Sequence, residues 1–162
     1  MARGNRGEVS SSTRGIVFGR QGYYDVIQYI TLGQKGNAVD FGNLTYSQEN
    51  AGGCGSPTRG IIWGGEKQPS PHYVNNIEYI TIATTGNAVD FGDDVLGYLG
   101  SNSQSSPIRA FFTGGYQPSP GASTKQIRSF NIASGGTAID WGDASTVISG
   151  LSGLSNAHGG LG

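Results

Sequence analysis

The stretch Gly36-Asn-Ala-Val-Asp-Phe-Gly42 returns as Gly86-Asn-Ala-Val-Asp-Phe-Gly92 and, with three substitutions, as Gly136-Thr-Ala-Ile-Asp-Trp-Gly142. Both steps are 50 residues long. A fixed period of this length is typical of proteins built from repeated supersecondary units. The 162-residue chain is therefore predicted to contain three homologous units of about 50 residues.

Two further segments repeat upstream of this stretch, in the same order in every unit. The nearer segment occupies residues 27–32, 77–82 and 127–132, again at a spacing of 50 residues. The farther segment, an arginine followed by a short apolar run, occupies residues 14–19, 59–65 and 109–115. The first step is here only 45 residues, so the first unit is shorter by five residues between Phe18 and Ile27. That stretch is expected to be a loop, because loops tolerate insertions and deletions.

Each repeated segment has the composition of a β-strand. Ile77-Glu-Tyr-Ile-Thr-Ile82 is rich in β-branched and aromatic residues, and Arg59-Gly-Ile-Ile-Trp63 is a short apolar run that ends in a glycine pair. Ala88-Val-Asp-Phe91 lies between two turn-forming pairs. A fourth strand is expected before the next arginine segment, for example over residues 95–99. No stretch combines a helical period with good caps, so the predicted fold class is all-β.

Four short strands in a unit of about 50 residues are the pattern of a kelch-type β-propeller blade. The repeat domain is expected to span residues 13–162, with units at approximately 13–56, 57–106 and 107–155 and a partial next strand at 156–162. Closed propellers typically contain about four to eight blades. We therefore expect the three tandem repeats to be completed by oligomerisation or docking, or to form a smaller threefold body such as a β-prism.

The polar, Gly/Ser-rich residues 1–12 are interpreted as an N-terminal arm. Two readings are open for this arm: it orders when the protein docks on a partner, or it is a frayed end.

Composition and charge argue against several classes of function. The net charge of −1 gives no electrostatic footprint for nucleic acid or an anionic membrane, and no apolar run is long enough to span a bilayer. His72 and His158 have no repeated partner, and neither metal-ligand spacing nor a phosphate-binding loop is present. We therefore expect no enzyme activity, cofactor or metal. Cys54, the single cysteine, is interpreted as a small buried apolar residue.

One acidic residue recurs at the same place in each unit, namely Asp40, Asp90 and Asp140. These carboxylates form either a ring of cation ligands or a set of acceptors for backbone N–H groups in turns. We favour the turn interpretation, because a calcium loop gathers several oxygen ligands within about a dozen residues and these copies do not. The glycine pairs Gly64-Gly65 and Gly114-Gly115 are expected to let the innermost strands approach one another closely.

Two proline-rich loops, Gln68-Pro-Ser-Pro71 and Gln117-Pro-Ser-Pro120, lie at like places in the second and third units. They are either contact loops or rigid connectors between strands, since proline stiffens a chain. Aromatic side chains nearby would anchor a protein interface or stack on a sugar. The candidate partner or glycan contacts are Trp63, Pro69, Pro71, Tyr73, Tyr116, Pro118 and Pro120.

The run Arg59-Gly-Ile-Ile-Trp-Gly-Gly65, followed by Asn76-Ile-Glu-Tyr-Ile-Thr-Ile-Ala-Thr-Thr-Gly-Asn-Ala-Val-Asp-Phe-Gly-Asp93, resembles the kelch-like repeats of structural proteins from marine cyanobacterial phages. The resemblance covers about residues 13–162. It implies a virion protein that is assembled in the cytoplasm of the host.

Three functions follow from this resemblance and from the candidate contacts. The first is a decoration or knob protein on the capsid exterior, with the major capsid protein or another virion protein as its partner. The second is a tail-associated adhesin or tail-fibre component that binds a host surface glycan or receptor. The third is a general kelch-type interaction scaffold. All three are non-enzymatic, and a homo-oligomer is expected in each.

Overall fold

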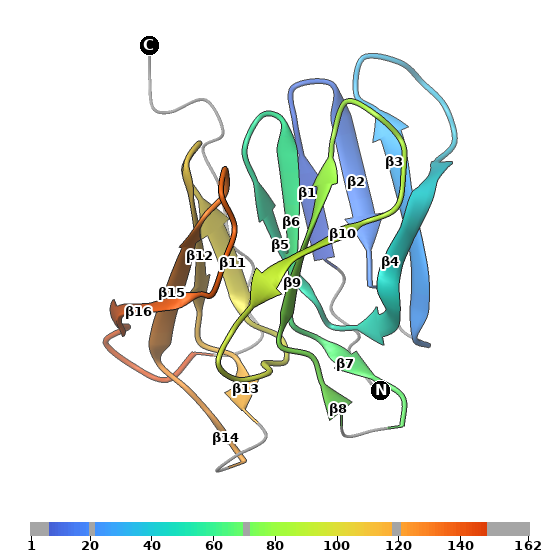
Figure 1. The fold of residues 1–162 in the computed structure, drawn as a ribbon. Helices are drawn as coiled ribbons and strands as arrows, with labels where there is room; N and C mark the ends of the chain where they lie inside the picture. Colours follow the sequence, from blue (N-terminus) through green and yellow to red (C-terminus); the bar gives the residue numbers. More distant parts are fainter. Residues whose placement is uncertain (1–6, 20–21, 70–71, 118–120, 149–162) are drawn as a thin grey trace.

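The computed structural model describes residues 7–19, 22–69, 72–117 and 121–148 (Figure 1). Sixteen strands and no helix are assigned in these ranges, which confirms the predicted all-β class. The same ranges accordingly contain no helix that could span a membrane.

Twelve of the strands form three antiparallel sheets of like order, which lie side by side from the blue to the orange part of Figure 1. Sheet 1 contains β1 (Gly7–Ser10), β2 (Arg14–Phe18), β3 (Tyr24–Thr31) and β4 (Val39–Glu49). Sheet 2 contains β5 (Gly52–Gly55), β6 (Arg59–Trp63), β9 (Asn76–Thr81) and β10 (Val89–Asp93). Sheet 3 contains β11 (Asn102–Ser105), β12 (Arg109–Thr113), β15 (Gln126–Asn131) and β16 (Ile139–Asp143). Each sequence repeat therefore supplies the last three strands of one sheet.

The register of the strands repeats along with the sequence. The arginine that opens the second strand of each sheet faces Thr31, Thr81 or Asn131. The pairing of the third and fourth strands is interrupted in all three sheets at the Asp-Phe-Gly or Asp-Trp-Gly triplet, where a β-bulge forms. The repeated segments were predicted to be strands, and the structure confirms this.

A further strand precedes each arginine segment as predicted, but it does not lie at the example residues 95–99. Residues 95–99 form bends and one isolated bridge from Leu99 to Tyr116, whereas β1, β5 and β11 precede the arginine segments. These strands have the sequences Gly-Glu-Val-Ser, Gly-Gly-Cys-Gly and Asn-Ser-Gln-Ser, which carry little β-propensity. The unit boundaries near residues 57 and 107 therefore fall inside sheets 2 and 3, and the arm expected over residues 1–12 includes β1 from residue 7 onward.

The first strands of the three sheets, β1, β5 and β11, lie next to one another. Glycines in β5 make this approach possible: a Cβ at Gly52 would lie 2.5 Å from the Ser103 hydroxyl, and one at Gly53 would lie 2.6 Å from the Glu8 carbonyl. Ser105 of β11 closes the contact, since its hydroxyl accepts a hydrogen bond from the Gly55 N–H and donates one to the Gly55 carbonyl.

The hydrophobic core lies between the sheets rather than within one layer. We call the face of a sheet that packs on the following sheet its forward face, and the opposite face its rear face. The forward face of sheet 1 supplies Ile16, Phe18, Ile27 and Phe41, which pack on rear-face residues Ile62, Ile80, Ile82 and Ala88 of sheet 2. The forward face of sheet 2 supplies Ile61, Trp63 and Ile77, which pack on rear-face residues Phe112, Phe130, Ile132 and Ala138 of sheet 3.

Two short hairpins stand beyond the ends of the sheets, at the lower edge of Figure 1. The first consists of β7 (Glu66–Lys67) and β8 (His72–Tyr73), and β7 extends sheet 1 by pairing with β4. The second consists of β13 (Tyr116–Gln117) and β14 (Ala122–Ser123). Each hairpin directly follows a glycine pair in the sequence. It occupies the place at which the first unit is five residues shorter.

Candidate functional site

Two of the recurring aspartates accept hydrogen bonds from the backbone at the bulges. The Asp90 carboxylate accepts a hydrogen bond from the Gly92 N–H at 3.1 Å, and Asp140 accepts one from Gly142 at 3.0 Å. For these two residues the turn interpretation is confirmed. Asp40 is likewise exposed, and no cluster of three or more His, Cys, Asp or Glu side chains fit for a metal ion occurs in the described ranges.

At the bulges of sheets 1 and 2, the following glycine is where two sheets meet backbone to backbone. Gly42 and Gly92 have φ angles of 149° and 142°. A Cβ at either residue would lie 2.3 Å from a carbonyl oxygen of the next sheet, that of Gly86 or Gly136 respectively. A side chain at these positions would therefore push neighbouring sheets apart.

The glycine pairs after β6 and β12 do make close contacts, but not with the innermost strands as expected. A Cβ at Gly64 would lie 2.7 Å from the Tyr98 carbonyl, and one at Gly114 would lie 2.1 Å from the Ile148 carbonyl. The following glycines donate to the same carbonyls, Gly65 to Tyr98 at 2.8 Å and Gly115 to Ile148 at 2.9 Å. These pairs therefore anchor the segments that leave β10 and β16, and the close approach of the innermost strands depends on β5.

The prediction that Trp63 contacts a partner is wrong. Its side chain is 1% exposed at the end of β6, because strand alternation turns it toward sheet 3. The ring lies 4.3 Å from that of Phe112 and 4.9 Å from that of Tyr98, measured between centroids. Trp63 is thus part of the core between sheets 2 and 3.

Tyr73 and Tyr116, by contrast, are brought together. Tyr73 ends β8 and Tyr116 begins β13, and their ring centroids lie 6.1 Å apart in an edge-to-face arrangement. Both rings are half-buried, and Pro69, which lies between β7 and β8, is exposed. The remaining proline candidates, Pro71, Pro118 and Pro120, lie outside the described residues.

A carboxylate lies near Tyr73 in this tyrosine pair. Burial raises the pKa of the Tyr73 phenol, and the nearby carboxylate of Glu66 raises it further. Tyr73 is therefore neutral at physiological pH. A pair of aromatic rings on two hairpins is suited to stacking on a sugar or to anchoring a protein contact.

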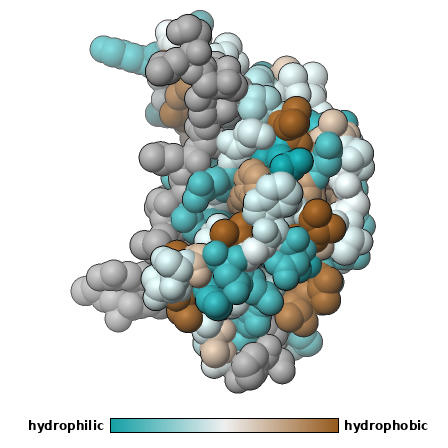
Figure 2. Space-filling view, turned by 90° about the vertical axis from the view of Figure 1, so that its left-hand side faces the viewer, coloured by the Kyte–Doolittle hydropathy of each residue, from teal (hydrophilic) through white to brown (hydrophobic). Residues whose placement is uncertain are grey.

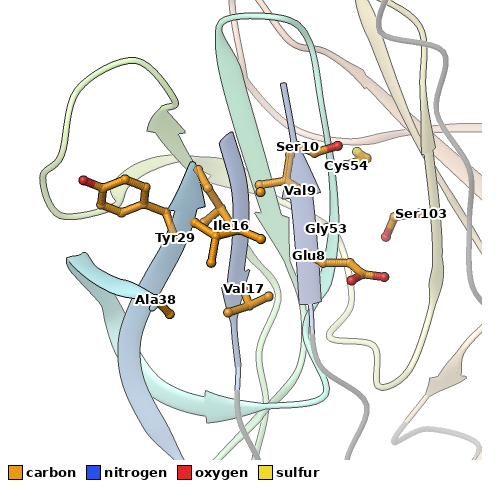
Figure 3. Close-up of a pocket in the computed structure, with 12 residues that line it drawn as sticks. Glu8, Val9, Ser10, Ile16, Val17, Tyr29, Ala38, Gly53, Cys54 and Ser103 are labelled. Atoms are coloured by element: carbon orange, nitrogen blue, oxygen red, sulfur yellow. The ribbon is translucent and has the colours of Figure 1, made fainter. Parts of the chain in front are cut away.

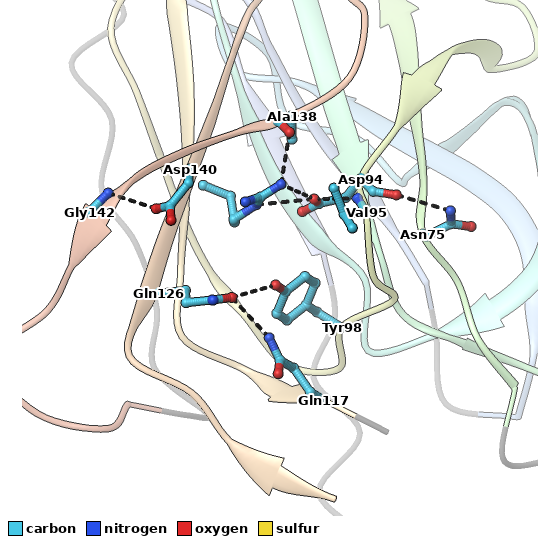
Figure 4. Close-up of polar contacts among 10 residues, drawn as sticks. Asn75, Asp94, Val95, Tyr98, Gln117, Gln126, Ala138, Asp140 and Gly142 are labelled. Atoms are coloured by element: carbon cyan, nitrogen blue, oxygen red, sulfur yellow. Dashed lines mark hydrogen bonds and ion pairs between the residues drawn. The ribbon is translucent and has the colours of Figure 1, made fainter. Parts of the chain in front are cut away.

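A polar network fixes the base of the second hairpin (Figure 4). The Tyr98 hydroxyl donates a hydrogen bond to Oε1 of Gln126 at 2.9 Å, and the Gln117 side-chain amide donates to the same oxygen at 3.1 Å. The hairpin is thereby tied to sheet 3 and to the segment after β10. Tyr116, which precedes Gln117, is held in place by this network.

Two buried carboxylates connect neighbouring sheets, and no sequence motif indicated their partners. Glu78 of sheet 2 accepts hydrogen bonds from the backbone N–H and the hydroxyl of Thr45 in sheet 1. Asp94 pairs with Arg128 of sheet 3 at 2.7 Å, and the same guanidinium donates to the Ala138 carbonyl at 2.8 Å (Figure 4). Burial raises the pKa of Asp94, and the ion pair with Arg128 opposes that rise. Both groups hold sheets together.

The outer faces of the two end sheets expose apolar positions that are buried at the internal interfaces. On the rear face of sheet 1, Val17, Ile30 and Leu32 are 40%, 44% and 51% exposed, whereas the equivalent residues of sheet 2 are at most 1% exposed. On the forward face of sheet 3, Trp141 is 50% exposed, whereas the equivalent Phe41 is 3% exposed. Figure 2 shows the side of the molecule formed by sheet 3, where apolar and polar residues are interspersed.

A cavity of about 410 Å³ opens beside β1 (Figure 3). Its lining includes rear-face residues Val17 and Ile30 together with Glu8, and Cys54 and Ser103 of the innermost strands. Burial raises the pKa of the Cys54 thiol to about 12, so this sulfur is protonated and a poor nucleophile at neutral pH. The cavity is continuous with the rear face of sheet 1, which supplies Val17 and Ile30 to its lining.

No protein-family model matches the chain, and a search of curated proteins found no significant match. Solved structures do match. One of them, reported as the structure of YjhT, is similar with a TM-score of 0.74 at 10% sequence identity. The match covers 88% of this chain and 51% of YjhT, so the chain spans about half the length of that protein. At this identity the likeness concerns the fold alone.

Proposed function

We propose that this chain is a non-enzymatic structural protein of three kelch-like β-propeller blades, each blade being one of the three sheets. In this proposal it is located on the exterior of a phage particle as a capsid decoration or knob. It acts by burying surface against other proteins, and no reaction is involved.

The observation that carries this proposal is the exposure of both outer blade faces. Full burial of an aliphatic side chain of this size contributes about 1.5–3 kcal/mol, and Val17, Ile30 and Leu32 are each 40% exposed or more on one face. Large side chains at repeated interface positions are costly to leave in water. A protein whose outer faces have this composition is suited to assembly.

The location on a virion rests on the resemblance of the repeats to those of cyanobacterial phage structural proteins. It is tested by immunogold labelling of purified particles with antibodies raised against the isolated chain. Label over the head supports a decoration protein, and label at the tail supports an adhesin. Particles without label would refute a virion protein and leave a general interaction scaffold of the kelch type.

A second candidate function is favoured by the contact between Tyr73 and Tyr116. In this alternative the two hairpins bind a host surface glycan by stacking, as in a tail-associated adhesin. Alanine substitution at a stacking aromatic typically costs about 2 kcal/mol or more at an interface hot spot. The test is binding to a glycan array by wild type and by Tyr116→Ala. Tyr24→Ala is the matched control, because Tyr24 is an exposed tyrosine of sheet 1. Binding that both variants retain would refute the role of the hairpins.

A further inference from the structure

We infer that the partner of the two outer blade faces is a second copy of this chain. Sheet 3 of each copy packs on sheet 1 of the other, so that two copies form one closed ring of six blades. The inference rests on the proposed propeller architecture and adds the identity of the partner.

The first observation is a hydrogen bond that repeats from blade to blade. Arg14 of sheet 1 donates to the Ile82 carbonyl of sheet 2 at 2.7 Å, and Arg59 of sheet 2 donates to the Ile132 carbonyl of sheet 3 at 2.9 Å. Arg109 of sheet 3 stands at the same position and lies over the Trp141 ring at 4.4 Å, as Arg14 lies over Tyr29 at 4.6 Å. Its guanidinium thus faces the open side of sheet 3.

The carbonyl that completes this series belongs to sheet 1. Leu32 occupies the position of Ile82 and Ile132, and it follows β3 on the rear face that nothing covers among the described residues. A second copy that continues the series therefore places its Leu32 carbonyl next to Arg109. The donor of the next hydrogen bond in the series is therefore in sheet 3, and its acceptor is in sheet 1.

A second hydrogen bond, between backbone groups, also repeats from sheet to sheet. Among the described residues, it too leaves one unpaired group on sheet 1 and one on sheet 3. The Gly86 N–H donates to the Phe41 carbonyl at 2.8 Å, and the Gly136 N–H donates to the Phe91 carbonyl at 3.0 Å. The next members of this series are the Gly36 N–H and the Trp141 carbonyl. Space exists beside the forward face of sheet 3: a Cβ built at Gly142 meets no described atom within 4 Å, whereas at the equivalent Gly42 and Gly92 the neighbouring backbone lies at 2.3 Å.

The polar positions at the new interface are compatible as well. Glu78 and Thr45 bond across the first internal interface. Gln28 occupies the position of Glu78 in sheet 1, and Ser145 occupies the position of Thr45 in the segment after β16. A glutamine accepts a hydrogen bond from a serine as a carboxylate does from a threonine. The interface between copies therefore brings no like charges together at this point.

The geometry of closure points to two copies. A face on sheet 3 that fits a different face on sheet 1 is a heterologous interface, which closes into a ring when the rotation per subunit allows it. Propellers of about four to eight blades are closed, and two copies supply six. The chain also matches about half of YjhT over 88% of its own length, so two copies make up the length of that chain.

The oligomeric state of the intact chain tests the inference. Light scattering coupled to size exclusion is expected to give about twice the 16.8 kDa mass of one chain. Leu32→Asp is expected to give a folded monomer, because this side chain is exposed within one copy and buried only between copies. Val89→Asp is the matched control. Val89 is 50% exposed at the outer edge of sheet 2, whose faces are both covered, so the dimer should persist.

A mixing experiment tests the head-to-tail arrangement. Trp141→Asp damages the forward face of sheet 3, and Leu32→Asp damages the rear face of sheet 1. Each variant alone is expected to be monomeric, with circular dichroism of the wild type. An equimolar mixture is expected to associate, because one intact interface remains between the two variants. A variant that dimerises alone would show that like faces pair, and would overturn the inference.

A wild-type monomer, or an open polymer larger than two copies, would also overturn ring closure by two chains. These results are separate from the proposed function, which immunogold labelling of particles decides. A monomer that labels the particle leaves the structural role standing without the ring. A dimer that is absent from particles leaves the ring standing without the role.

Discussion

The two adjacent phenylalanines of β12 test how much of the stability comes from packing between sheets. Phe112 is 0% exposed on the rear face of sheet 3. Its ring centroid lies 4.3 Å from that of Trp63 in sheet 2 and 5.7 Å from that of Phe130 in its own sheet. Phe111 points to the opposite face, is half-buried, and contacts Trp141 at 5.4 Å.

Phe112→Ala is expected to destabilise the chain by about 3–5 kcal/mol, the usual cost of removing a fully buried phenylalanine ring. Each lost contact between rings accounts for about 0.5–1.5 kcal/mol of this. The total free energy of unfolding of a small protein is only about 5–15 kcal/mol, so this loss is a large share of the stability. Phe111→Ala is expected to cost about 1 kcal/mol, since one ring contact and part of the burial are lost.

Urea unfolding measures both free energies, with tryptophan fluorescence as the probe because Trp63 reports on this interface. Both substitutions are made in a chain that also carries Leu32→Asp, so that association between copies adds nothing to either value. Equal losses for Phe111→Ala and Phe112→Ala would refute the conclusion that the core lies between the sheets.

Three further predictions concern other buried groups. Because burial raises the pKa of Cys54 from 9.0 to about 12, the unfolded chain releases the thiol proton first. Stability therefore falls as pH rises above 9, by up to about 1.4 kcal/mol per pH unit, and Cys54→Ala removes this part of the slope in urea titrations. Arg59→Ala removes charged hydrogen bonds across the interface between sheets 2 and 3. Thermal unfolding of the monomeric chain should therefore show a loss of about 1.5–3 kcal/mol in the free energy of unfolding, whereas Arg109→Ala has little effect. Asp94→Ala leaves the Arg128 charge buried and is expected to cost about 3–5 kcal/mol by calorimetry, with most of this regained on adding Arg128→Met.

The sequence predicted the repeated strands because their signals are local. Strands such as β6 and β9 contain apolar and β-branched residues in runs that few other structures accommodate. The residues of the innermost strands were predicted wrongly for the opposite reason. β5 consists of three glycines and a cysteine, and it is a strand only because β6 pairs with it and the neighbouring inner strands pack against it.

The surface was harder to predict than the strands. Val17, Ile62 and Phe112 stand at equivalent positions and are all apolar, yet only Val17 is exposed within one chain. A repeat carries the same residues whether its neighbour is present or not, so one unit cannot indicate which face is open. The same ambiguity explains why Trp63 was predicted to contact a partner. The contact between Tyr73 and Tyr116 depends on how two hairpins from different parts of the chain are positioned.

Among the described residues, the packing clusters join sheet 1 to sheet 2 and sheet 2 to sheet 3, and this limits how the chain loses its structure. A linear array of units with nearest-neighbour coupling opens from its ends, since a terminal unit has one supporting interface and a central unit has two. In an isolated chain, hydrogen exchange is therefore slowest in β6 and β9 of sheet 2. Closing the array into a ring removes the ends, so that amide protection becomes equal in all three sheets and unfolding becomes a single cooperative event.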